Sequence, residues 1–188
     1  MRADAAARHG GPSLPRPTAV SVNLSLARAS ALLTTGLLAG AFLYGRVVVV
    51  PTFDAVPLDV HLAFRTALMT RNARVMQLLM AAALVTCVWH AVAARGATRR
   101  AAGGAAVLAT ASLLITRFGN VPINLEIKKW ARGALPADHL DRLQVWDRYN
   151  DARVACAVGA LVLLVVAALD GRRAADRGVA AAQPVGRG

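Results

Sequence analysis

The stretch RVACAVGALVLLVVAAL, residues 153–169, decides the fold of this chain. After its first arginine it contains no charged residue, and Val, Leu and Ala make up most of it. A helix needs about 20 apolar residues to cross the hydrocarbon core of a bilayer. Flanking residues supply the few that are missing here. The stretch therefore predicts a membrane-spanning helix and not a strand or helix of a soluble core.

Three further apolar segments precede it, at about 26–50, 73–94 and 101–118. Of the 188 residues, 56% are hydrophobic and only 5% are aromatic, which is more aliphatic side chain than one soluble domain of this size buries. We predict the fold class as all-α, an integral membrane antiparallel four-helix bundle. The four-span domain is expected at 26–170, between disordered tails at 1–25 and 171–188.

The net charge of +12 is distributed as in a membrane protein. The 20 Arg and 2 Lys lie in the tails and between the apolar segments, and no zinc-finger or RNP pattern is present, so we expect membrane lipid and not nucleic acid as the partner. The abundance of Arg, Ala and Gly is typical of a GC-rich bacterial sequence.

The orientation in the membrane depends on the segment ARGATRR at 94–100, which has three arginines between the second and third spans. The positive-inside rule places such a turn in the cytoplasm. With four spans, both termini are then cytoplasmic, and we expect a multi-pass protein of the cell membrane. The opposite orientation stays open, because half of the basic residues lie outside the predicted cytoplasmic pieces.

Two longer connections, 51–72 and 119–152, are expected on the external side. In the second, Pro136 is the expected first residue of an external amphipathic helix. Its apolar residues recur every three positions, at Leu140, Leu143 and Trp146. We expect this helix to lie at the membrane surface and to lead directly into the fourth span.

The segment TRFGNVPIN at 116–124 contains the first group of candidate functional residues. Pro122 lacks a backbone donor, which predicts a kink or a break in the third span. If the helix is only kinked, Asn120 and Asn124 lie one turn apart on one face. Amides at this depth should point into the bundle, because lipid cannot pair with them. Alternatively, these asparagines only satisfy the backbone groups that the proline leaves free.

The segment WDRYNDAR at 146–153 contains the second group. Trp146, Asn150 and Arg153 fall on one helical face, and the predicted topology brings them to the same side of the membrane as the two asparagines. Arg148 can pair with Asp151. Arg153 either joins this polar cluster or snorkels to the interface and anchors the fourth span, and both uses stay open.

Together these motifs resemble the anthrone oxygenase-like family of small four-helix membrane proteins, most of whose bacterial members are catalogued as a domain of unknown function. The resemblance covers about residues 26–170 and consists of N-V-P-I-N, a following tryptophan, and W-x-R-Y-N-x-x-R. It implies oxidation of a polycyclic anthrone to an anthraquinone by dioxygen without a cofactor. The implied partner is a hydrophobic aromatic small molecule.

The resemblance also implies which residues act. A base must form a carbanion, and a cation or amides must hold the oxyanion. We expect the catalytic residues to be Asp151, Arg153, Asn120 and Asn124. We expect the substrate-binding residues to be Trp130, Trp146 and Asn150. Asp151 stands where the family often has histidine, which leaves the role of the base to a carboxylate or to no residue.

A rival interpretation is a non-catalytic four-span protein whose polar cluster is a structural clasp between the third and fourth spans and supports a partner or binds lipid. No metal is expected at Cys87 and His90, three residues apart, because His90 lies beside Trp89 near the cytoplasmic end of the second span, where such a pair is ordinary at the membrane interface. We also predict no disulfide between Cys87 and Cys156.

Overall fold

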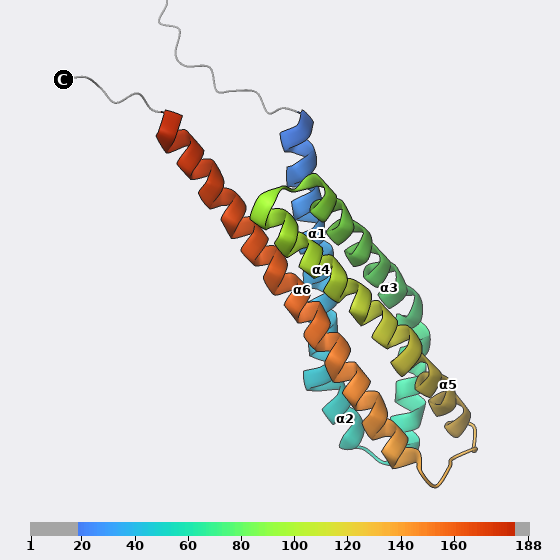
Figure 1. Cartoon of the computed structure of the whole chain (residues 1–188). Coiled ribbons are helices and arrows are strands. Elements are labelled where there is room, and N and C mark those ends of the chain that lie inside the picture. Colours follow the sequence, from blue (N-terminus) through green and yellow to red (C-terminus); the bar gives the residue numbers. More distant parts are fainter. Residues whose placement is uncertain (1–18, 183–188) are drawn as a thin grey trace, which may run out of the picture.

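The computed structural model describes residues 19–182, with side chains up to residue 171, and in this part of the chain all regular structure is helical (Figure 1). The first span consists of α1 (Ala19–Tyr44), the π-helical turn η1 (Gly45–Val49) and α2 (Val50–Asp54). The second is α3 (Leu58–Ala93). The third consists of α4 (Gly96–Ile115), the π-helical turn η2 (Thr116–Asn120) and α5 (Val121–Trp130), and the fourth is α6 (His139–Ala182).

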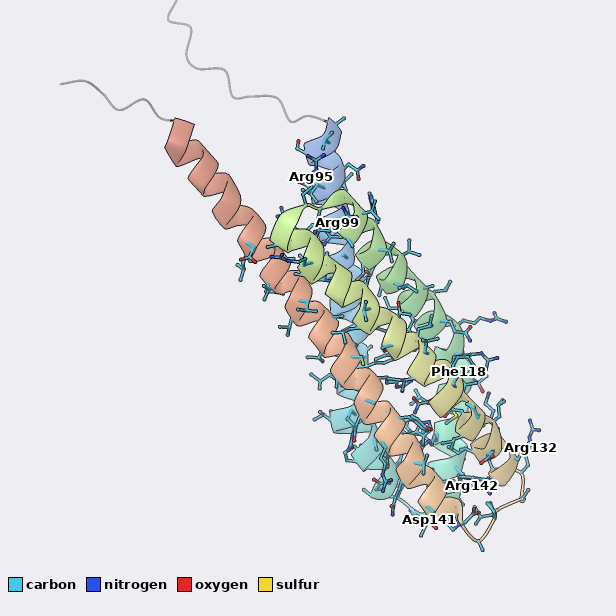
Figure 2. All side chains as sticks on the ribbon, viewed as in Figure 1. Arg95, Arg99, Phe118, Arg132, Asp141 and Arg142 are labelled. Atoms are coloured by element: carbon cyan, nitrogen blue, oxygen red, sulfur yellow. The ribbon has the colours of Figure 1, made fainter. Side chains whose placement is uncertain are left out.

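The four spans form an antiparallel bundle, which confirms the predicted fold class (Figure 1). α1 packs against α3 and α6, and α4 packs against the same two helices. α3 and α6 therefore occupy opposite corners of the bundle. The loop 131–138 lies at one end, which we call the α5 end. Arg95 and Arg99 lie at the other end, far from Arg132 and Arg142 (Figure 2).

The outer surface of the bundle is apolar, as expected for helices in lipid. Each span is long and apolar enough to cross a membrane. Large aliphatic side chains point outward from all four spans, for example Leu33, Leu78, Val107 and Val162, with 55–73% of their surface exposed. A soluble protein would not expose so many. The chain is a multi-pass membrane protein.

Charged residues bound an apolar zone on each of the four spans. No Asp, Glu, Lys or Arg occurs within 29–45, 75–94, 101–116 or 154–169. As helices, stretches of 16–20 residues measure about 24–30 Å, which is close to the hydrocarbon thickness. The arginines that follow this zone toward the α5 end are Arg46, Arg74, Arg117 and Arg153. α2, α5 and the first turns of α3 and α6 therefore extend beyond the zone.

Spans one and three share a local design that keeps a proline inside a long helix. Both contain Arg-x-x-x-Val-Pro, at 46–51 and 117–122. In each span a π-helical turn ends just before the Val-Pro pair, and the proline sits in the first turn of the next helix. The wider turn lets the Val121 N–H donate to the Thr116 carbonyl. The third span therefore does not break at Pro122. The π-helical turn places the residue that lacks a backbone N–H in the first turn of the next helix, where no donor is needed.

Close contacts between α4 and α6 rest on two glycines. A Cβ atom at Gly104 would lie 3.0 Å from the Leu163 side chain, and one at Gly159 would lie 3.1 Å from Leu108. A side chain at either position would require the facing leucine to move by a few tenths of an ångström. The two glycines therefore allow the leucines of the facing helix to pack closely, as is common between membrane helices.

The ends of the predicted segments differ in detail from the structure. α6 begins at His139, three residues after the expected Pro136, and the amphipathic segment is its first part and not a separate element. Residues 19–25 and 171–182 of the predicted tails belong to α1 and α6. The rest of those tails, 1–18 and 183–188, lies outside the described residues.

Candidate functional site

Trp146 is the centre of a polar cluster near the α5 end. Its indole N–H donates to the Asn124 Oδ1 atom at 2.7 Å. Its backbone carbonyl accepts a hydrogen bond at 3.1 Å from the side-chain amide of Asn120. Both asparagines contact the same residue of α6, so they share a face of the third span, as predicted for a helix that does not break. These bonds tie the third span to the fourth.

Arg153 lies two turns further along α6 than Trp146 and points into the bundle. Its Nε and NH2 groups both donate to the Asn150 Oδ1 atom, at 3.0 and 2.7 Å. Its guanidinium carbon is 4.5 Å from the centre of the Phe42 ring on α1 and 5.7 Å from the Trp146 ring. These are cation–π distances. A snorkelling anchor would make no such contacts.

A second arginine, Arg65 on α3, enters the same cluster and was not predicted. Its guanidinium carbon lies 4.1 Å from the centre of the Trp146 ring and 5.6 Å from that of Phe53. Its NH1 group is 3.2 Å from Nε2 of His61, whose ring stacks on Phe53 at 5.0 Å. Because α3 and α6 are opposite corners, the contact with Trp146 crosses the centre of the bundle. Arg65 is only 4% exposed.

Several buried polar atoms of this cluster have no hydrogen-bond partner within the described residues. They are Nε and NH2 of Arg65, Oδ1 of Asn120, Oδ1 of Asp147 and Nδ2 of Asn150. Asn120 and Asn150 are 0% and 3% exposed. Proteins rarely leave buried polar groups unpaired, since each one costs about 1–3 kcal/mol. The cluster thus presents three donors and two acceptors to a ligand or to water.

Two residues expected in the site lie elsewhere. Asp151 is half-exposed and forms an ion pair with Arg46 of the first span, and not with Arg148. Trp130 packs with Leu62 and Ile127 in a hydrophobic cluster at the end of α5. None of the hydrogen bonds and ring contacts around Trp146 involves Trp130.

The sequence contained a signal for the residues that were missed. Arg46 and Arg65 are charged residues within long helices that adjoin apolar segments, and such residues are rare unless they have a function or a partner. Asp147 follows Trp146 directly, but Asp151 was the carboxylate predicted for the site. In the described residues, no three His, Cys, Asp or Glu side chains are placed to hold a metal ion.

The fold and this cluster define a small four-span membrane protein with a buried polar site at one end of the bundle. A sequence model described as anthrone oxygenase matches residues 64–163, which is more than half of the chain and includes every residue of the cluster except Phe42, Phe53 and His61. The chain belongs to the anthrone oxygenase family. No curated protein and no solved structure matches it.

Proposed function

We propose that this protein oxidises a hydrophobic aromatic compound of the anthrone class with dioxygen. The observation that carries the proposal is the group of buried, unpaired polar atoms around Trp146, in a chain of this family. Buried polar atoms without a protein partner are available to a bound substrate. The position just beyond the apolar zone suits a substrate that dissolves in the bilayer and enters from it.

The reaction has a simple balance. A base removes a proton from the methylene carbon of the anthrone, and the electron pair moves into the ring system as an enolate. The enolate gives one electron to dioxygen, and the resulting carbon radical and superoxide combine to form a C–O bond. The peroxide takes up a proton. Loss of the second methylene proton and cleavage of the O–O bond then give the anthraquinone carbonyl and water.

We assign roles within this reaction to the residues that the family motifs indicate. Arg153 and the amides of Asn120 and Asn124 supply the positive charge and hydrogen bonds near the developing oxyanion. Trp146 and Asn150 line the substrate position. Asp151 as the base and Trp130 as a substrate contact remain part of the proposal with less support, since Asp151 is paired with Arg46 and Trp130 is packed apart.

A second candidate, the structural clasp, is favoured by a different observation. Asn124, Asn150 and Arg153 already make hydrogen bonds to side chains of the same cluster. A clasp needs these bonds and no substrate. We also propose that the protein lies in the cell membrane with both termini in the cytoplasm. The orientation rests on the arginines of the 94–100 turn.

Purified protein in lipid nanodiscs, supplied with anthrone and air, tests the function. We expect anthraquinone to form with one dioxygen consumed per product, measured by absorbance and an oxygen electrode. Asn120→Ala should lower the rate by about tenfold or more, because a buried amide near the oxyanion is lost. Asn72→Ala, at an exposed position of α3, is the matched control. If the parent protein forms no product above the uncatalysed rate, the clasp is the better account.

A further inference from the structure

Arg65 and Asp147 stand out as a buried cation and a carboxylate that share an environment without pairing. The charges of Asp147 and Asp54 both act on Arg65, and the influence of Asp147 is the larger. Nevertheless, no ion pair joins these two residues, and each keeps unpaired buried atoms. The charge of Arg46 also acts on the Asp147 carboxylate. Each of the two charged groups therefore keeps buried polar atoms that are available to a bound molecule.

The surroundings of Arg65 hold its guanidinium in place for such a molecule. Trp146 and Phe53 lie against it, and NH1 is near His61. The two other nitrogens, Nε and NH2, are free to donate. A fixed guanidinium with two free donors is the group that proteins use to hold an oxyanion. Arg153 is less suited, because its Nε and NH2 already donate to Asn150.

We propose that Asp147, in place of Asp151, is the base that removes the methylene proton and that Arg65, in place of Arg153, holds the resulting enolate oxygen. This inference rests on the proposed function. The carboxylate Oδ1 takes the proton, the C–H bond breaks, and its electron pair passes through the ring to the carbonyl oxygen, where Arg65 stabilises the negative charge. The methylene carbon and the carbonyl of an anthrone lie on opposite sides of the central ring. A base and a cation that are unpaired and separated match that arrangement, whereas an ion pair would not.

Exchange of the methylene protons of anthrone for deuterium under argon, followed by proton NMR, measures this step without the oxidation. We expect the parent protein to accelerate exchange, and Asp147→Asn to lower the acceleration by about a hundredfold. Asp147→Glu, which keeps a carboxylate, should exchange faster than Asp147→Asn. Asp59→Asn, exposed in the first turn of α3, should match the parent.

The role of Arg65 has its own readout in the binding of alizarin, a hydroxyanthraquinone whose phenolate absorbs at longer wavelength. Bound parent protein should shift the absorption of alizarin to the red at neutral pH, because a buried cation favours the phenolate. Arg65→Gln should abolish the shift and slow exchange by about a hundredfold, and Arg65→Lys should retain part of both. Arg71→Gln, exposed on the same helix, is the control.

The outcomes separate the inference from the proposed function. Exchange by the parent that is lost in Asp147→Asn supports the inference even if no anthraquinone forms in air, in which case the proposed oxidation is wrong. Oxidation in air with equal exchange in parent and Asp147→Asn would overturn the inference and leave the function intact. An unchanged alizarin spectrum in Arg65→Gln would remove Arg65 from the oxyanion site. Absence of exchange in the parent would also overturn the inference.

Discussion

Replacement of Arg153 tests whether the polar cluster stabilises the α5 end of the bundle. In Arg153→Ala, the Asn150 Oδ1 atom loses both of its hydrogen bonds, at 3.0 and 2.7 Å, and the cation 4.5 Å from the Phe42 ring disappears. An acceptor left unpaired costs about 1–3 kcal/mol and a cation–π contact about 1 kcal/mol. Since the two losses overlap, we expect about 2–3 kcal/mol for Arg153→Ala.

Arg153→Lys should cost about half as much, because lysine keeps the charge but not the planar pair of donors. The measurement is unfolding in mixed micelles by SDS titration, followed by tryptophan fluorescence, with thermal unfolding in detergent as a second probe. Arg99→Ala at the opposite end is the control and should unfold like the parent. If Arg153→Lys is as stable as the parent, the contacts with Asn150 and Phe42 contribute nothing, and Arg153 only anchors α6.

Two further predictions concern packing and topology. Gly119→Ala should destabilise the protein by about 1–3 kcal/mol in the same titration, because the new Cβ would lie 2.5 Å from the Tyr149 ring, whereas Gly40→Ala meets no atom within 4 Å and should be tolerated. Single cysteines at Thr98 and Ala134, in a background without the native cysteines, should react with a membrane-impermeant reagent from opposite sides, and labelling of both from one side would contradict the four-span topology.

The spans and one half of the site could be predicted from the sequence. Each apolar segment has, alone or with a few flanking residues, the length of a membrane span, because lipid demands an uninterrupted run of apolar residues. Trp146, Asn150 and Arg153 share a helical face by spacing alone, and the order of the spans places Asn120 and Asn124 at the same end. Helical periodicity and an even number of membrane crossings are enough to predict these positions, and both can be read from the sequence.

The other half of the site depends on packing across the bundle and could not be predicted in this way. Arg65 and Trp146 are 81 positions apart on helices at opposite corners, and no spacing rule connects them. Asp151 falls near the predicted face of α6, but a π turn in the first span brings Arg46 to it. A π turn depends on how a helix packs, so the residues that follow it cannot be assigned to a face by counting.

That π turn acts as a rotational offset within the first span. Phe42 and Phe53 are eleven residues apart, and at about 100° per residue an uninterrupted α-helix would bring both rings to within roughly 20° of one direction. The extra residue of η1 changes the angle between the directions of the two rings by about 100°. This change is close to the quarter turn that separates the directions from one helix to its two neighbours in a four-helix bundle. Phe42 consequently faces Arg153 on α6, while Phe53 faces Arg65 on α3. A single inserted residue thus lets the first span contact both arginines through its phenylalanine rings.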